Sequence, residues 1–234
     1  AAAALVREVA PEAVVHCAAM SDVNACAREP ERAERVNSTA TGALAQAAAH
    51  ANVRLIYTST DLVFDGSCAP YDERSTPSPT GPYMQSKLAG EERVLGASLG
   101  FLVVRVALVY GLAGGRHGKF SDRMVAWLKE GQSVDLWRDQ YRTAVEVSDA
   151  AALLCDLLDA DAGGILHLGG PERVSRYDMG LGLASALGLE TSLCRSTSIE
   201  ADPRFAGQPR DTSFDVSRLR EVVGRDALGL AAGC

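Results

Sequence analysis

Short apolar runs alternate along this chain with longer segments in which apolar residues recur at helical spacing. Four apolar runs, each followed by polar residues as buried parallel strands are, predict strands at AVVHCAA (13–19), VRLIYTST (53–60), FLVVRVALVYG (101–111) and GGILHLGG (163–170). The segments between and after them predict helices at 30–50, 82–99, 120–130, 147–159 and 175–188. This alternation predicts an α/β fold: a Rossmann-like, doubly wound parallel sheet with helices on both faces.

Two stretches interrupt the alternation. The loop DGSCAPYDERSTPSPTGP (65–82) follows a predicted strand at its carboxyl end, where α/β sheets place their ligands. After about residue 170 the alternation gives way to a polar, irregular segment. We therefore expect a Rossmann domain over 1–168, with 113–145 contributing to a substrate cleft, and a small substrate-binding lobe over 169–234.

Composition narrows the function classes. The 234 residues are 47% hydrophobic and 23% charged, which is typical of a globular protein, and they offer no apolar run of membrane-spanning length. A net charge of −7 without a basic cluster argues against nucleic-acid binding. The six cysteines and four histidines show no metal-ligand spacing, so we expect no metal site, and reduced thiols in a cytoplasmic protein.

The stretch GPYMQSK (81–87) carries the candidate chemistry. Tyr83 and Lys87 are four residues apart behind a proline that suits a first helical turn, so they share a helix face. A phenol titrates near about 10, whereas a cation about 4 Å away at an effective dielectric of about 20 favours the phenolate by roughly 4 kcal/mol. We therefore expect Lys87 to lower the pKa of Tyr83 into the range of a general acid.

An ordinary pair on a solvated helix face is the alternative interpretation. The preceding strand end, YTSTDLVFDG, favours catalysis because it brings hydroxyl groups to the edge where a cleft is expected. Thr60 in particular supplies the additional hydrogen bond that a substrate carbonyl beside Tyr83 would need.

The block STDLVFDG, then PYDE, then YMQSKLAGE resembles the extended short-chain dehydrogenases/reductases, and among them the dTDP-4-dehydrorhamnose reductase-like branch. HCAAMSDV, with Asn37 downstream, and VVRVALVYG resemble further segments of that family, so the resemblance covers nearly the whole chain. It implies reduction of a 4-keto-6-deoxy sugar nucleotide by NADPH or NADH, and a homodimer is a further expectation.

The resemblance also implies residue roles. Tyr83 would be the general acid, Lys87 would hold the nicotinamide ribose, and Thr60 would hydrogen-bond the carbonyl. The cofactor would in addition lie against residues at the strand tips, namely Ala18, Ala19, Met20, Thr58, Ser59 and Leu108. Substrate contacts would come from Asp61, Val63, Phe64, Arg142 and Arg210.

Two departures from the family pattern affect these expectations. The Gly-rich strand–turn–helix that binds a cofactor pyrophosphate is missing before residue 13, so we interpret the chain as a fragment, or as a protein with a degenerate front, and its choice between NAD and NADP is open. GLAGG (111–115) does not replace that turn, because it follows the third predicted strand. Near the C-terminus Gln208 stands where relatives often have an arginine, and Arg210 is the candidate to replace it.

One local feature separates the reaction types. Sugar-nucleotide dehydratases of this superfamily follow the threonine with an Asp–Glu pair, whereas here Leu62 follows Asp61. Simple reduction is therefore favoured over dehydration. The alternatives are a non-catalytic, NADP-binding regulatory subunit similar to that of methionine adenosyltransferase, and a sugar-nucleotide epimerase.

Overall fold

The computed structural model describes residues 2–112, 120–201, 205 and 207–230. His117, Cys234 and most of GLAGG lie outside these residues. The chain divides into two compact units, of which the first comprises Ala1–Asp65, Glu73–Val106 and Leu157–His167. The second comprises Gly66–Asp72, Ala107–Asp156 and Leu168–Cys234, so it also takes in a middle stretch that the sequence assigned to the first domain.

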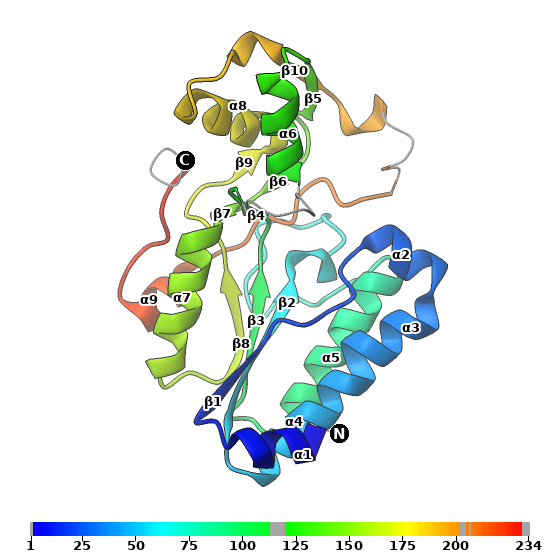
Figure 1. Ribbon diagram of the computed structural model, residues 1–234, viewed down its shortest axis with the longest axis vertical. Coiled ribbons are helices and arrows are strands. Elements are labelled where there is room, and N and C mark those ends of the chain that lie inside the picture. The colour runs from blue at the N-terminus through cyan, green and yellow to red at the C-terminus, as the bar shows by residue number, and fades with distance from the viewer. Residues whose placement is uncertain (1, 113–119, 202–204, 206, 231–234) are drawn as a thin grey trace. The chain divides into compact units, whose positions relative to one another are not determined.

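A four-stranded sheet is the centre of the first unit (Figure 1). Its order is β1-β2-β3-β8, with bounds Ala13–His16, Arg54–Thr60, Leu102–Val106 and Gly164–Leu168. β1 pairs with β2, and β2 with β3, in parallel. The predicted α/β class with a central parallel sheet is confirmed.

Helices α3 to α5 lie on one side of this sheet in Figure 1. The helices of the first unit are α1 (Ala2–Val9), α2 (Val23–Arg28), α3 (Pro30–Glu34), α4 (Ala40–His50) and α5 (Pro82–Ala97). A π-helical turn, Arg35–Thr39, joins α3 to α4, so the predicted helix over 30–50 is nearly continuous. Leu55 and Tyr57 of β2 pack with Val94 of α5 and Val103 of β3 in a buried core.

All four strands of the sheet are shorter than predicted, β2 by one residue and β8 by three. β1 ends at His16, so residues 17–19 form the segment that leaves the strand. The run 101–111 is divided: β3 ends at Val106, and Val109–Tyr110 forms β4, which pairs with β7 (Val145–Glu146) in another sheet. A continuous apolar run gives no signal for such a break, because apolar residues continue through it.

The second unit combines short strand pairs with helices. β5 (Val134–Trp137) pairs with β10 (Cys194–Thr197), and β6 (Tyr141–Arg142) pairs with β9 (Val174–Ser175). Its helices are α6 (Phe120–Lys129), α7 (Val147–Asp159, which ends in the first unit), α8 (Arg176–Ala186) and α9 (Ser217–Val223). The predicted helices at 120–130, 147–159 and 175–188 are confirmed within a few residues.

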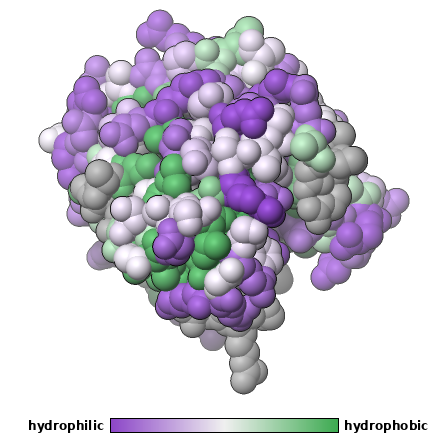
Figure 2. Space-filling view, turned by 90° about the horizontal axis from the view of Figure 1, so that it is seen from above, coloured by the Kyte–Doolittle hydropathy of each residue, from purple (hydrophilic) through white to green (hydrophobic). Residues whose placement is uncertain are grey.

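The surface agrees with the mixed composition. In the view of Figure 2, hydrophilic residues surround smaller groups of hydrophobic ones. Among the described residues, no helix combines the length and the apolar character that crossing a bilayer requires.

Candidate active site

Helix α5 begins where the sequence predicts. Gly81 is extended, and Pro82 takes the first helical position, where a missing N–H costs nothing. The buried positions of the helix recur at helical spacing and form one face: Tyr83, Met84, Ser86, Lys87, Gly90, Glu91 and Val94. The face that carries the candidate pair is thus a buried face, and the alternative of a solvated helix pair is excluded.

Lys87 is held inside the first unit by neutral groups. Its Nζ donates a hydrogen bond of 2.7 Å to the carbonyl oxygen of Thr58 and lies 4.0 Å from the centroid of the Tyr57 ring. Only 2% of the residue is exposed. Burial lowers the pKa of Lys87 to about 8, and the charges of Glu91 and Cys17 oppose that shift.

Tyr83 and Thr60 come together at the end of β2. The Thr60 hydroxyl lies near enough to the Tyr83 phenol to affect its pKa, and it donates to the Asp61 carboxylate at 3.2 Å. Burial raises the pKa of Tyr83 to about 12, opposed by the Thr60 hydroxyl and reinforced by the negative charge of Asp61.

The expected lowering of the Tyr83 pKa by Lys87 is wrong for this structure. Desolvation of the phenol is the largest effect, and Lys87 is not among the groups that shift the pKa of Tyr83. The ammonium is instead directed at the Thr58 carbonyl and the Tyr57 ring, so a helical spacing of four did not determine where its charge acts.

Asn37 joins the elements around the site. Its side chain accepts a 2.8 Å hydrogen bond from the backbone N–H of Met20, and it donates at 3.0 Å both to the Met20 carbonyl and to the Ser86 hydroxyl of α5. The residue is fully buried in the π-helical turn, a geometry that frequently occurs at functional sites. The sequence placed Asn37 in a family segment but gave it no role, because these partners lie 17 and 49 residues away.

Tyr57 is a second residue that the sequence missed. Its hydroxyl donates to the carbonyl oxygens of Asn37 at 3.3 Å and Lys87 at 3.5 Å, and the His16 ring stacks on its ring with centroids 5.6 Å apart. A Cβ at Gly90 would lie 2.5 Å from the Tyr57 hydroxyl. Glycine at position 90 of the motif therefore makes room for the ring that underlies Lys87.

The residues expected at the cofactor differ in exposure. Ala18 is exposed, whereas Ala19, Met20 and Thr58 are half-buried. Ser59 is 7% exposed, and within the described part of the chain its Oγ has no hydrogen-bond partner. An unsatisfied buried hydroxyl has a free donor and acceptor for a ligand.

Of the residues expected at the substrate in the first unit, Asp61 adjoins Thr60, whereas Val63 and Phe64 are fully buried. Phe64 packs near His167 and the Arg105 guanidinium, at 5.7 and 5.2 Å. Interior packing accounts for both apolar side chains, and their contact with substrate stays a prediction.

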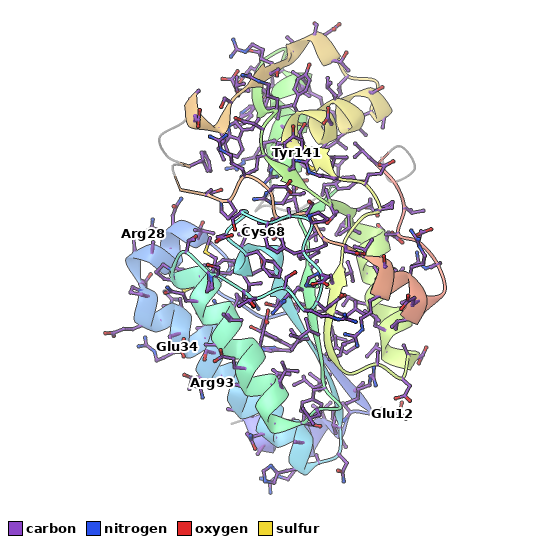
Figure 3. The ribbon with its side chains drawn as sticks, turned by 180° about the vertical axis from the view of Figure 1, so that it is seen from behind. Glu12, Arg28, Glu34, Cys68, Arg93 and Tyr141 are labelled. Carbon is purple, nitrogen blue, oxygen red and sulfur yellow. The ribbon has the colours of Figure 1, made fainter. Side chains whose placement is uncertain are left out.

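The second unit holds the other three predicted residues. Leu108 and Arg142 line one narrow cavity, and Arg142 donates to the carbonyl oxygens of Tyr141 at 2.6 Å and Pro209 at 3.1 Å. Arg210 is exposed and forms an ion pair with Glu200. Figure 3 labels Tyr141, whose ring stacks on the Arg173 guanidinium 3.5 Å from its centroid. The roles of Leu108, Arg142 and Arg210 toward ligands stay predictions.

The first unit suits the nicotinamide end of a dinucleotide. Lys87 and the Ser59 hydroxyl offer donors near the ends of the parallel strands, where such sheets bind ligands. The Gly-rich turn that would hold the pyrophosphate is absent from the sequence. Among the described residues no group of His, Cys, Asp and Glu could hold a metal ion.

Comparisons with known proteins show the family to which the chain belongs. The family model described as RmlD substrate binding domain matches residues 1–227. The probable low-salt glycan biosynthesis reductase Agl14 of Haloferax volcanii is 33% identical over 223 residues, which cover 94% of this chain and 74% of that protein. Methionine adenosyltransferase 2 subunit beta of Rattus norvegicus is also 33% identical, over 94% of this chain and 67% of that protein.

The solved structures give the same result. The dTDP-4-dehydrorhamnose reductase of Bacillus anthracis, in complex with NADP, superposes with a TM-score of 0.91 at 26% identity and covers 99% of this chain and 82% of that one. This chain therefore has the fold of that reductase over almost its whole length.

Proposed function

Because the chain belongs to the RmlD substrate-binding-domain family, we propose that it reduces a 4-keto-6-deoxy sugar nucleotide with NADPH or NADH. The observation that carries the proposal is the buried Tyr83 phenol with the Thr60 hydroxyl beside it and Lys87 one helical turn along the same buried face. A proton donor and a second hydroxyl meet there, as protonation of a carbonyl oxygen requires.

The raised pKa of Tyr83 fits the direction of reduction. With a pKa of about 12 the phenol is protonated at neutral pH, so it is ready to give its proton as hydride reaches the carbonyl carbon. The alkoxide that forms is a stronger base than a phenolate, so the proton transfer is favourable. The reverse reaction needs the phenolate, which burial disfavours.

A bound nicotinamide cofactor would supply the hydride. Lys87 would donate to the ribose hydroxyls from its position above Tyr57, and the Ser59 hydroxyl is the further donor on β2. Thr60 would orient the carbonyl oxygen toward Tyr83. Asp61 lies beside Thr60, but Leu62 takes the place of a second carboxylate, so elimination of water has no acid–base pair.

A regulatory role is the second candidate. Its support is the 33% identity to methionine adenosyltransferase 2 subunit beta, a likeness as strong as that to the archaeal reductase. The buried Tyr83 phenol, with the Thr60 hydroxyl beside it, favours the enzyme, since a binding surface has no need of a buried proton donor.

An assay with dTDP-4-dehydrorhamnose separates these candidates. A reductase oxidises one NADPH or NADH for each sugar, and its product gains two hydrogens by mass spectrometry. The rate should depend on Tyr83, so Tyr83→Phe should lower it. Tyr177→Phe, in α8 of the second unit, is the matched control and should keep the wild-type rate. An epimerase would form an isomer without net cofactor oxidation. Absence of sugar-dependent oxidation, together with binding to a methionine adenosyltransferase catalytic subunit, would overturn the proposal in favour of the regulatory role.

A further inference from the structure

A buried ion pair lies one turn beyond Lys87 on α5. Glu91 accepts from Arg105 of β3 twice, from Nε at 3.1 Å and from Nη2 at 2.7 Å, and both side chains are 2% exposed. The Nη1 of Arg105 lies 3.5 Å from the Nε2 of His167 in β8. The carboxylate is thereby fixed in place by a two-pronged contact.

Glu91 and Lys87 are four residues apart on the buried face of α5. Side chains at this spacing are neighbours, with Cβ atoms about 5–6 Å apart. Both residues are buried, so water screens their interaction little. The Lys87 ammonium contacts neutral groups, the Thr58 carbonyl and the Tyr57 ring, and Glu91 is the full negative charge next to it on α5.

We propose that Glu91, fixed by Arg105, is a positioning residue that keeps the buried Lys87 ammonium charged. Arg105 sets the location of the carboxylate, and the carboxylate supplies the field at Lys87. The proposal rests on the proposed function only for the use made of that charge, the binding of cofactor hydroxyls. Burial lowers the pKa of Lys87, and the charge of Glu91 opposes that shift, as this arrangement requires.

Several other titratable or charged groups lie around Lys87 and Glu91, and the variants used in the test should leave them unchanged. The titratable and charged groups around Lys87 and Glu91 are His16 of β1, Cys17 after it, Tyr57 of β2, Tyr83 of α5, Arg105 of β3 and His167 of β8, whose backbone N–H donates to Glu73. Burial and the Lys87 charge lower the pKa of His16.

The test reads Lys87 directly. The chain has three lysines, at 87, 119 and 129, so protein labelled with ¹³C at lysine Cε gives three NMR signals to follow against pH. Lys87→Arg assigns the signal, and the exposed Lys129 is the internal control in each titration. We expect Glu91→Gln to lower the titration midpoint of Lys87 by about one pH unit or more.

Glu92→Gln is the matched control, because it removes the same charge from the next, exposed position of α5. It should leave the Lys87 midpoint within about 0.3 pH unit of wild type, since solvent screens an exposed charge.

The double variant Glu91→Leu/Arg105→Met guards against a variant that fails to fold, since apolar residues replace a buried pair with little loss of stability. Its Lys87 midpoint should lie between those of wild type and Glu91→Gln, because the cation of Arg105 is removed together with the carboxylate. If the Lys87 midpoint stays within about 0.3 pH unit of wild type both in Glu91→Gln and in Glu91→Leu/Arg105→Met, the proposal is overturned, and the Glu91–Arg105 pair has a structural role alone. These signals need neither cofactor nor sugar, so failure of the reductase assay would not decide this test.

Discussion

Two buried cations in the first unit have opposite environments. Around Arg105, a carboxylate makes a two-pronged ion pair and leaves the guanidinium fully engaged. Around Lys87, a backbone carbonyl and an aromatic ring hold the ammonium, and no carboxylate of the described residues forms an ion pair with it. A cation paired in this way serves the fold, whereas one held by neutral groups keeps donors and charge for a ligand. The difference supports the proposal that the Lys87 region is the site.

The largest effect on stability should come from breaking the buried ion pair between Glu91 and Arg105. Arg105→Met leaves the Glu91 carboxylate buried without its counter-charge, and we expect a loss of about 3–5 kcal/mol in the free energy of unfolding, measured by urea denaturation. Arg93→Met, in α5, is the control. Arg93 donates to the Ser38 hydroxyl at 2.7 Å, and its exposed ion pair with Glu34, labelled in Figure 3, has an N–O distance of 3.8 Å, so the ion pair contributes about 1 kcal/mol or less. Equal losses in both variants would remove the contrast between paired and exposed cations.

A pH-dependent effect should follow from the Lys87 region. The pKa of Lys87 is about 8 in the folded protein and 10.5 in the unfolded chain, so between these values the unfolded state binds the additional proton and wild-type stability rises with pH. Lys87→Met lacks that rise. Its free energy of unfolding relative to wild type should therefore fall by about 3 kcal/mol between pH 8 and 10.5. A difference that stays constant with pH would show that the Lys87 amine is solvated.

A smaller effect on stability should come from the close contact between Gly90 of α5 and Tyr57, the ring that lies against Lys87. A Cβ at Gly90 would lie 2.5 Å from the Tyr57 hydroxyl and 2.6 Å from the Asn37 carbonyl oxygen, so Gly90→Ala should cost about 1–3 kcal/mol in unfolding free energy. Gly96→Ala, at a position of α5 where a Cβ meets nothing within 4 Å, is the control and should be neutral or slightly stabilising. If the two substitutions have the same effect, Tyr57 does not constrain this face of α5.

The sequence predicted the parts of this picture that depend on local pattern. The strand ending at Thr60 and the helix beginning at Pro82 follow from periodicity, a proline at the first turn and polar residues at a strand end, and they put Tyr83 beside Thr60. The spacing of Tyr83 and Lys87 also placed both on one face, as the structure has them.

Tertiary packing accounts for what the sequence did not predict. The direction of the Tyr83 pKa depends on burial by segments distant in the chain, among them the one that carries Cys26. The partners Glu91 and Arg105 are 14 residues apart on a helix and a strand, a separation without a periodic signal. The hydrogen bonds of Asn37 with Met20 and Ser86 likewise form only when three segments meet.

The most direct test of the central claim is the single-turnover rate of NADPH oxidation by the keto-sugar nucleotide in wild type and Tyr83→Phe. The substitution keeps the ring and removes the proton donor, so the account predicts a rate lower by about 10²–10⁴-fold. A Tyr83→Phe rate within about twofold of wild type, with the variant folded, would contradict the assignment of Tyr83 as the acid.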